Sequence, residues 1–497
     1  MIGVAVSGDT STLVLDIGKS NAKLVLIDRH GDVLGAMRTA NRSVPDPAHG
    51  FMALGTERLA DWLRRGVPDL LQGRAPGRIA ITTHGAAFCA LDDDGLVLPP
   101  IDYEWDGYGE VTAAFDASLA DFSHHGTPRL PQGLNGGRQI DFVQHRWPDL
   151  AARIRCWLPY PQYWAWWFSG VACSEVSSLG CHTGLWAPDQ GRFSNWAVAS
   201  GVASRFAPMR RAWDVIGRLR PELAMAWGLP DGVEVIAGAH DSNACLARHL
   251  GAHPLATVIS TGTWCVTMAP GADTTRLQPD RDHLVNVAVD GRAVSTARFM
   301  GGREFAVLCD DADPELATTE ALAEVLRQGW MALPAFAQGG GPFVGQRGRV
   351  LRDGDPVIDG ISGVPQGLRP ALAALYCANV SALLVSDLVN RGAVETSSPV
   401  IMEGPLAHST AYRLALANAV APRPLWRSID PLEGTARGAW MLAHWEDEGG
   451  PPQGVPLQAT FAPDGVLGLA LRAHAQEWGA RVGDMVLGGA AMFGGDE

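Results

Sequence analysis

The chain of 497 residues lacks several features that would assign it to a special class of protein. Its eight cysteines include no CxxC pair and no metal-ligand spacing, which indicates reduced, mostly buried thiols and no disulfides. No run of 18 apolar residues occurs, and the N-terminus has neither the basic region nor the apolar core of a signal peptide. We therefore expect a soluble cytoplasmic protein.

Positive charge is also scarce. Against 53 Asp and Glu stand only 39 Lys and Arg, a formal net charge of −14. Nucleic acids and anionic membranes reward clustered cations, so neither is expected as a partner. The rest of the composition, 47% apolar and 19% charged, is that of an ordinary globular protein. Since this length exceeds what one hydrophobic core usually serves, we expect two large domains.

Apolar strands alternate with helices along the chain, which predicts an α/β fold. The strand predictions are a β-meander over 12–40, single strands over 78–85, 233–241 and 398–403, and hairpins over 88–109 and 257–268. The helix predictions are 50–65, 138–155, 242–251, 315–329, 368–391, 408–420, 433–448 and 465–479.

Two stretches share one layout, "LVLDIGKSNAKLVLI" at 13–27 and "TVISTGTWCVTM" at 257–268. Each is an apolar strand, a small polar turn with glycine, and a second apolar strand. The repetition predicts two similar domains that face each other across a cleft. We place the boundary between them near 242–256.

The turn in the first stretch has the residues of a phosphate-binding loop. Gly18 permits a tight turn whose following amides converge on an anion. Neutral donors and positive charge come from Lys19, Ser20, Asn21 and Lys23. Asp16 would lie beside a phosphate only if a divalent cation lay between them. A plain surface hairpin explains the same pattern, and the Walker A spacing GxxxxGK[ST] is absent near it.

Two further stretches carry polar side chains at the ends of apolar strands. In "GAHDSNACL" (238–246), Asp241 is either a helix N-cap or a general base for a substrate hydroxyl. In "STGTW" (260–264), a glycine and three hydroxyls form either a polar hairpin turn or a set of donors for phosphate oxygens. Each alternative stays open when its stretch is taken alone.

In this order, the three elements resemble the FGGY family of carbohydrate kinases. The resemblance covers roughly residues 12–445. It includes "SEVSSLGCHTGLWAPDQGRFSNWAVASGV" (174–202), "IMEGP" (401–405) and "EGTARGAWMLA" (433–443). The adjacent His240 and Asp241, with Thr263 22 residues beyond the acid, are most similar to the L-fuculokinase and L-rhamnulokinase branch.

The resemblance implies a fold of two actin-like ATPase (ribonuclease H-like) domains facing each other across a nucleotide and sugar cleft. The expected division is an N-terminal domain over 1–245 for sugar and phosphate binding and a C-terminal nucleotide-binding domain over 246–450. A helix and a tail follow over 451–497.

The resemblance also assigns roles to individual residues. Asp241 becomes the proton acceptor, and Asp16 and Asp241 face Mg²⁺. The sugar contacts are His84, Gly85, Asp106, His240, Ser242 and Arg298. The ATP contacts are Gly18, Lys19, Ser20, Asn21, Lys23, Gly262, Thr263, Gly301 and Gly404.

Three departures from the family pattern bear on these roles. The adenosine loop reads "MEGPLAHST", which leaves only Gly404 to match. Tyr108 stands where the family has an arginine, in "WDGYG" (105–109), so the identity of the sugar stays open. Arg298 is either a substrate contact or an ordinary surface arginine.

The implied activity is ATP-dependent phosphorylation of a ketose at its C1 hydroxyl, with ATP and Mg²⁺ as cofactors and a homodimer as a possible assembly. A 6-deoxyketohexose such as L-fuculose or L-rhamnulose is the expected substrate. One alternative is a kinase for L-xylulose, D-xylulose or erythrulose. Another is a non-catalytic sugar or nucleotide sensor with the same fold.

Overall fold

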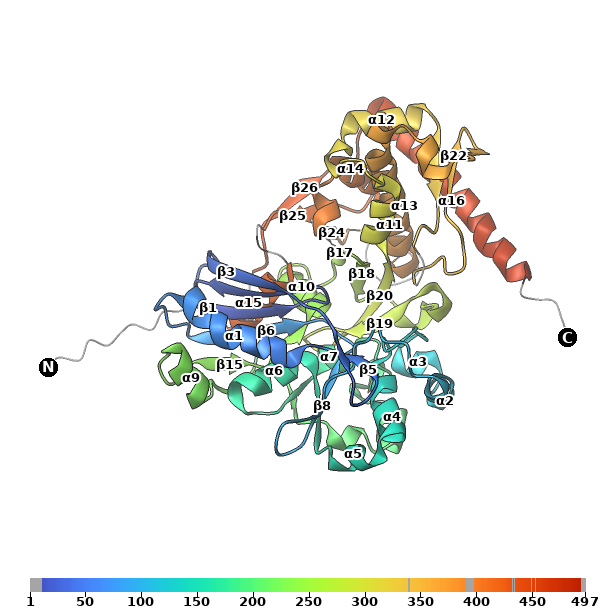
Figure 1. Ribbon diagram of the computed structural model, residues 1–497. Helices are drawn as coiled ribbons and strands as arrows, with labels where there is room; N and C mark the ends of the chain where they lie inside the picture. The colour runs from blue at the N-terminus through green and yellow to red at the C-terminus, as the bar shows by residue number, and fades with distance from the viewer. Residues whose placement is uncertain are drawn as a thin grey trace. The chain divides into compact units, whose positions relative to one another are not determined.

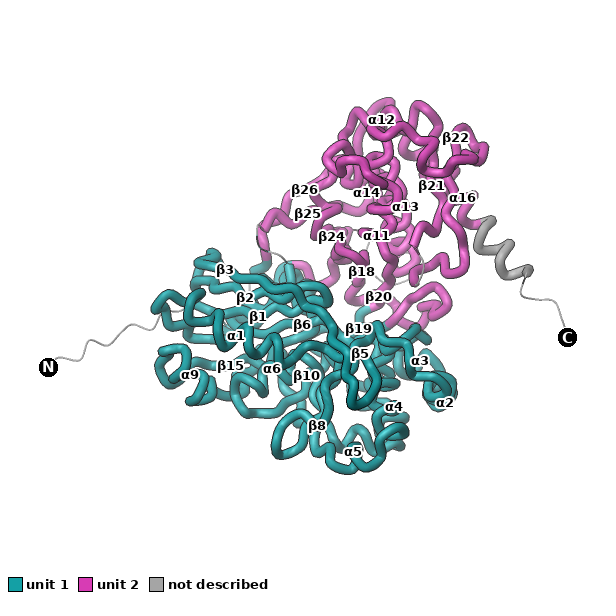
Figure 2. Tube along the Cα trace, viewed as in Figure 1, with its two compact units in different colours: residues 1–252, 285–294, 431–454 teal, residues 253–284, 295–430, 455–497 magenta. Residues whose placement is uncertain are grey.

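The computed structural model describes residues 11–337, 340–389, 397–430, 432, 434–447, 449–451 and 453–492, with 484–492 described by their backbone alone (Figure 1). The chain forms two compact units (Figure 2). Unit 1 comprises residues 1–252, 285–294 and 431–454, and unit 2 comprises residues 253–284, 295–430 and 455–497. The predicted α/β fold in two domains is confirmed.

Unit 1 contains a seven-stranded mixed sheet. Its strands run in the order β14-β15-β6-β1-β2-β3, and β16 also pairs with β6. The bounds are β1 (Thr12–Ile17), β2 (Asn21–Ile27), β3 (Val33–Ala40), β6 (Arg78–Thr83), β14 (Val215–Arg218), β15 (Glu234–Ile236) and β16 (Ala239–His240). The β-meander predicted over 12–40 is therefore confirmed.

Unit 2 repeats this arrangement with the order β20-β18-β17-β24-β25-β26. These strands are β17 (Thr257–Thr261), β18 (Cys265–Pro270), β20 (Ala293–Phe299), β24 (Val400–Glu403), β25 (Leu425–Ser428) and β26 (Leu457–Thr460). In both sheets the first strand of the hairpin pairs antiparallel with the second and parallel with a central strand. The central strand then pairs parallel with the next strand, and that one antiparallel with the edge. The two similar domains expected from the repeated stretches are thus present.

The units do not follow the linear division expected from the sequence. The helix α15 (Gly434–Ala443) belongs to unit 1, although it comes after most of unit 2 in the chain. It packs on β1, on β6 and on α10 (Asp241–Leu250). At Gly438 the approach to α10 is so close that a Cβ would lie 1.9 Å from the Ala244 carbonyl oxygen. Of the helix and tail expected over 451–497, residues 451–454 are counted with unit 1 and residues 455–497 with unit 2.

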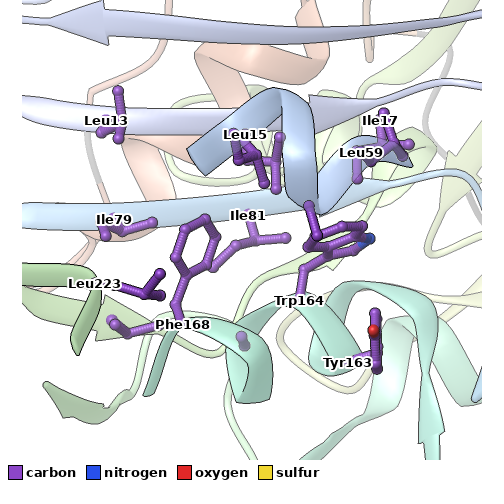
Figure 3. Packing of buried hydrophobic residues seen from close by; sticks show 14 of the residues in the cluster. Leu13, Leu15, Ile17, Leu59, Ile79, Ile81, Tyr163, Trp164, Phe168 and Leu223 are labelled. Carbon is purple, nitrogen blue, oxygen red and sulfur yellow. The ribbon is translucent and has the colours of Figure 1, made fainter. Parts of the chain in front are cut away.

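The larger hydrophobic cluster of unit 1 lies on one face of its sheet (Figure 3), and a smaller one, which includes Val14 of β1 and Ala439 of α15, lies on the other face. Leucine and isoleucine side chains of β1 and β6 meet aromatic rings from α6 (Tyr160–Ser169), among them the fully buried Trp164 and Phe168. Helix α1 (Thr56–Leu71) adds Leu59 and Leu63. The aromatic-rich stretch at 156–170 therefore serves mainly as core, which the density of its rings already favoured.

The other helices of unit 1 are α2 (Glu110–Ser118), α3 (Phe122–His125), α4 (Gly136–Arg146), α5 (Pro148–Arg153), α7 (Val176–Leu179), α8 (Asn195–Ala199) and α9 (Pro221–Trp227). Those of unit 2 are α11 (Gly301–Cys309), α12 (Thr319–Arg327), α13 (Arg369–Val389), α14 (Thr410–Val420) and α16 (Gly465–Met492). Smaller sheets are formed by β4 (Val44–Asp46) with β5 (Phe51–Ala53), by β7 (Phe88–Leu91), β8 (Leu96–Leu98) and β9 (Cys156–Pro159), by β10 (Ser174–Glu175) with β13 (Met209–Arg210), by β11 (Trp186–Ala187) with β12 (Arg192–Phe193), and by β21 (Trp330–Leu333), β22 (Arg349–Arg352) and β23 (Asp355–Pro356). Most of β19 (Leu284–Val287) is counted with unit 1.

Several predicted elements differ from the structure. The helices expected over 315–329, 433–448 and 465–479 run over Thr319–Arg327, Gly434–Ala443 and Gly465–Met492. For three others the reason is plain. The helix expected over 50–65 begins only at Thr56, because the strand β5 precedes it and Gly55 stands at its N-cap. The helix expected over 138–155 is two helices, since Pro148 starts a new one. The strand expected over 233–241 is interrupted at Gly238, which has a φ of +79°.

Among the described residues, one helical stretch, 366–389, is long and apolar enough to cross a membrane. However, 78% of its apolar window is buried inside the protein. It contains α13, whose side chains pack against α11, α14 and β18. This segment is therefore a core helix of unit 2.

Candidate active site

The candidate residues of unit 1 gather at one edge of its sheet. Strands β1, β6 and β16 are parallel, so their carboxyl ends meet there. Asp16 of β1 lies beside Thr82 of β6, and Thr83 lies beside His240 of β16. Asp241 follows directly as the first residue of α10. The sheet thus brings together two carboxylates that are 225 positions apart in the sequence, 16 against 241.

Asp16 is buried, with 5% of its surface exposed. Burial raises the pKa of its carboxyl to about 6. The hydrogen bond from Thr435 Oγ1, 2.6 Å from Oδ2, and the charge of Lys23 act against this shift, and the charge of Asp241 adds to it. Lys23 faces Asp16 across the β1–β2 ladder, and burial lowers its own pKa. The mutual repulsion of Asp16 and Asp241 indicates a site suited to a positive charge.

Asp241 is 26% exposed, and its partial burial raises the pKa of its carboxyl. Its Oδ1 accepts hydrogen bonds from the backbone N–H of Ser242 at 2.6 Å and from the Ser242 hydroxyl at 3.3 Å. His240 Nε2 lies 3.1 Å from the same oxygen. Because burial lowers the pKa of His240 to about 4, this contact is not an ion pair.

His84 extends the same edge at the end of β6. Its Nδ1 lies 2.9 Å from the carbonyl oxygen of Gly85, so Nδ1 carries the proton. Burial lowers the pKa of this histidine, opposed by the charge of Asp241, and the neutral ring then has Nε2 as a hydrogen-bond acceptor. The ring is fixed between Tyr103 and Tyr160, with centroids 5.5 and 5.2 Å away. Within the described part of the chain, Nε2 has no hydrogen-bond partner.

Gly85 is required by its contact with His240. A Cβ at this position would lie 2.9 Å from Cδ2 and Nε2 of the imidazole. It would also lie 3.6 Å from Cys181 Sγ. His84, Gly85, His240, Ser242 and Asp241 are therefore one contiguous group, as the sequence predicted.

The turn between β1 and β2 is tight, with the Gly18 N–H donating to the Asn21 carbonyl at 2.9 Å. Ser20 and Asn21 are exposed at its tip. Lys19 instead turns toward the loop after β8, where it pairs with Asp102 and lies 3.3 Å from Glu104. Its contact with phosphate stays a prediction.

The sequence-based prediction did not include Asp102; its choice of Asp106 as a sugar contact stays a prediction. Asp102 is 4% exposed and accepts hydrogen bonds from Lys19, from the Ser43 hydroxyl and from the Glu104 backbone. Burial alone would raise its pKa, but these bonds outweigh burial and lower it. Asp106 is exposed. The apolar residues before Asp102, "LPPI", signalled a buried position, whereas nothing comparable precedes Asp106.

Unit 2 has a cavity of about 860 Å³ at the equivalent edge of its own sheet. The β17–β18 turn contributes Gly262 and Thr263, both exposed, as predicted for a ligand-binding turn. The rest of the lining comes from the end of β17, from α11, from the start of α12 with the segment before it, and from the start of α14 with the segment before it: Thr261, Gly302, Arg303, Phe305, Pro314, Glu315, Ala317, Thr318, Thr319, Glu320, Pro405, Leu406, His408, Ser409 and Thr410. Most of these were not predicted. The sequence signal that could have located these lining segments is a pair of helix-capping sequences, "TTEA" at 318–321 and "HSTA" at 408–411.

Two predicted glycines border this cavity without lining it. A Cβ at Gly301 would meet Cys265 Sγ at 2.3 Å, so Gly301 serves packing, and its neighbour Gly302 lines the cavity. Gly404 has a φ of +81°, and a Cβ there would lie 1.9 Å from the Thr261 carbonyl oxygen. This close approach lets Thr261 Oγ1 accept from the Leu406 N–H at 3.1 Å.

Arg298 lies in unit 2 and is not a surface residue. Its side chain is buried, with Nε 3.1 Å from Asp282 Oδ2 and the guanidinium 4.6 Å from the centre of the Trp264 ring. The Arg298 guanidinium therefore packs against Trp264 of the β17–β18 turn. The alternative of an ordinary surface arginine is wrong, because the side chain is buried and its charge is paired with a carboxylate, as a buried charge requires.

No group of three or more His, Cys, Asp or Glu side chains suited to a metal ion occurs among the described residues. Asp16 and Asp241 offer carboxylate oxygens, the ligands that Mg²⁺ prefers. Mg²⁺ is often held by one or two carboxylates together with substrate phosphates and water. The donor set therefore fits this ion only when a nucleotide supplies the remaining oxygens.

Comparison with known proteins yields two family matches. Residues 11–247 match the FGGY family of carbohydrate kinases, N-terminal domain. Residues 253–451 match carbohydrate kinase FGGY, C-terminal domain. Together the matches span most of the chain.

Individual relatives agree with these matches. An L-fuculokinase of Salmonella typhi is 28% identical over 270 residues, which is 52% of this chain and 56% of that protein. One of Escherichia coli (strain K12) is 26% identical over 274 residues, with the same coverage. The chain thus matches little more than half the length of these curated relatives.

Solved structures match over nearly the whole chain. A carbohydrate kinase from Novosphingobium aromaticivorans has a TM-score of 0.83 and 35% identity, covering 96% of this chain and 99% of that one. A xylulose kinase from Lactobacillus acidophilus has a TM-score of 0.78 at 13% identity, covering 96% and 98%. The second likeness shows a shared fold alone.

Proposed function

Because the chain belongs to the FGGY family of carbohydrate kinases, we propose that it transfers the γ-phosphoryl group of ATP to a hydroxyl of a ketose. The observation that carries this proposal is the Asp241 carboxylate at the sheet edge. It is partly exposed, held by hydrogen bonds from Ser242, and close to the buried Asp16, whose pKa its charge raises. In this proposal Asp241 accepts the proton of the attacking hydroxyl.

The electrostatics of Asp241 support that role. Partial burial raises its pKa, which makes the carboxylate a better proton acceptor than an exposed one. The fixed hydrogen bonds to Oδ1 hold its orientation, so little reorganisation is needed when the substrate arrives. His84, Gly85 and His240 would contact the sugar, and the acceptor atom Nε2 of His84 suits a hydroxyl donor.

The charge of the site favours a neutral acceptor over a sugar acid. Lys19 is compensated by Asp102 and Glu104, and Lys23 faces Asp16. With Asp241 added, the carboxylates outnumber the cations. An anionic substrate would be repelled there. We propose a 6-deoxyketohexose such as L-fuculose or L-rhamnulose, phosphorylated at C1, which the similarity to L-fuculokinases supports.

The nucleotide would occupy the unit 2 cavity, contacted by the turn at Gly262 and Thr263 and by the segment that begins at Gly404. The turn at 18–21 and Lys23 would contact its phosphates from unit 1. Mg²⁺, held by Asp16, Asp241 and the phosphates, would neutralise negative charge on the nucleotide. A cytoplasmic location and a homodimer stay predictions.

The test is Asp241→Asn in a coupled ADP assay over a panel of ketoses, with ATP binding measured by calorimetry. We expect the variant to lose on the order of 10³-fold or more in kcat and to keep its affinity for ATP, since only the base is removed. Asp141→Asn is the matched control, because Asp141 is also a buried carboxylate whose pKa burial raises. Near-normal turnover by Asp241→Asn would refute the base assignment. A preferred substrate such as D-xylulose, L-xylulose or erythrulose would correct the sugar alone, and no turnover by the unaltered protein with ATP binding retained would favour a sensor.

A further inference from the structure

The turn after β6 carries two of the proposed sugar contacts, His84 and Gly85, and continues into Ala86. Ala86 has a φ of +51°, in the left-handed region that glycine adopts freely and alanine does not. The residue is buried, with 3% of its surface exposed. A strained backbone of this kind persists only where the surrounding structure holds it. The contacts of Ala86 therefore determine the shape of this turn.

The turn is anchored on both sides of Ala86. The His84 N–H donates to the last carbonyl of β1 at 2.8 Å, and the Tyr160 N–H donates to the Ala87 carbonyl at 3.1 Å. Between these anchors, the Ala86 carbonyl accepts a hydrogen bond from the side-chain amide of Gln139 at 2.6 Å. Gln139 belongs to α4 and is 3% exposed, so water does not compete for this hydrogen bond.

The same amide also holds the loop before α4. Its nitrogen has two N–H groups, and it donates to the Gly133 carbonyl at 2.7 Å as well. The Gly133 N–H in turn donates to the Tyr103 carbonyl at 2.9 Å, and the Tyr103 ring packs edge-on against the His84 ring. One buried amide thus fixes the backbone that follows His84 and, through Gly133, the residue that packs on the imidazole.

Resting on the proposed kinase function, we propose that Gln139 is a positioning residue for sugar binding: its hydrogen bonds keep Ala86 in the left-handed conformation and thereby hold His84 and Gly85 in the geometry that receives the ketose. Gln139 is itself buried and acts through this turn. The role concerns affinity for the sugar, because Asp241 is oriented by its own hydrogen bonds from Ser242.

The decisive variant is Gln139→Met, which keeps the length of the side chain and removes both donors. The Ala86 carbonyl then loses its hydrogen bond, and the strained turn relaxes toward negative φ, which moves Gly85 and the His84 ring. We expect KM and Kd for the sugar to rise about tenfold or more, with kcat changed less than about threefold and KM for ATP less than about twofold. Should this variant not fold, Gln139→Asn replaces it with the same expected shift, because its amide is one methylene too short to reach both carbonyls.

A second background separates this role from a general loss of packing. In Ala86→Gly the left-handed conformation carries no Cβ strain, so the turn keeps its shape with or without the amide. In that background we expect Gln139→Met to raise the sugar KM by less than about threefold. If Gln139 only filled space in the core, its substitution would have the same effect in both backgrounds.

The matched control is Ser194→Ala. The buried Ser194 hydroxyl also donates to a backbone carbonyl of unit 1, that of Gly184, at 2.7 Å. This control should lower stability and leave the sugar KM within about twofold.

The conformation of Ala86 is observed directly in a crystal structure of Gln139→Met without ligands. This measurement needs no substrate, so it stands even if the kinase function fails. A φ that leaves the left-handed region supports the proposal, and an Ala86 that keeps its φ would overturn it.

The sugars offered are L-fuculose, L-rhamnulose, L-xylulose, D-xylulose and erythrulose, with Kd from calorimetry and KM from the coupled assay. A sugar KM and Kd within about twofold of the unaltered protein, or an equal rise in both backgrounds, would also overturn the proposal. If the unaltered protein binds a ketose without phosphorylating it, the kinase function alone is refuted and the Kd values decide. Binding of none of these sugars would overturn both.

Discussion

Gly438 provides the sharpest test of how α15 is held in unit 1. A Cβ at this position would lie 1.9 Å from the Ala244 carbonyl oxygen, whereas ordinary contacts begin at 3.4 Å. The shortfall, 3.4 − 1.9, is 1.5 Å. Because the obstacle is backbone of α10, no side-chain rotation relieves it. In Gly438→Ala the two helices must separate, and α10 carries Asp241 at its first position.

The magnitude follows from two opposing terms. Overpacking of this kind costs about 3 kcal/mol, while alanine gains about 1 kcal/mol over glycine in a helix. The free energy of unfolding should therefore fall by about 2 kcal/mol. Unit 1 is larger than about 250 residues, so each kcal/mol lowers Tm by roughly 2 °C, and the expected decrease in Tm is roughly 4 °C.

Scanning calorimetry of Gly438→Ala and Gly479→Ala measures the difference. Gly479 is an exposed helical glycine of α16 with no atom within 4 Å of a Cβ. Its substitution should raise the free energy of unfolding by up to about 1 kcal/mol. A Gly438→Ala protein that melts no lower than the unaltered one would refute the close packing of the two helices. Equal losses from both variants would refute its attribution to this contact.

Two further predictions concern pH and the nucleotide. Burial raises the pKa of Glu175 to about 7 from 4.5, so the folded state binds the extra proton and its stability falls as the pH rises from 4.5 to 7. Glu175→Gln should remove about 3 kcal/mol of that fall in the free energy of unfolding. Denaturant unfolding of both proteins between pH 4.5 and 7 measures the difference, and an equal pH dependence in the two would contradict the prediction. Gly404→Ala should weaken ATP binding at least about tenfold in calorimetry, because its Cβ collides with the Thr261 carbonyl oxygen. Gly367→Ala, with open space around its Cβ, is the control, and equal affinities would refute the assignment.

The sequence predicted the fold better than the site. The apolar runs and the glycine-containing polar turns between them identified both hairpins, because strand, turn and strand are adjacent in the chain. The return of α15 to unit 1 was not predicted, since it depends on a contact between Gly438 and Ala244, far apart in sequence. For the same reason Asp102 was missed: its partner Lys19 is 83 residues away. The contiguous group around His84, Gly85, His240 and Asp241 was predicted through resemblance, and pairing of β6 with β16 explains its proximity.

The repeated sheets also show why topology alone does not assign chemistry. Asp16 is the residue before the last in β1, and Ser260 has the same place in β17. Their neighbours on the parallel central strands are Thr82 and Glu403, so the carboxylate changes strand between the units. In unit 1 the acid, Asp16, stands on the hairpin itself. It lies opposite Lys23 and accepts a hydrogen bond from the Thr435 hydroxyl. Equivalent backbones thus carry a carboxylate on the hairpin of one unit and hydroxyls on the hairpin of the other, so the shared topology does not fix the chemistry of either edge.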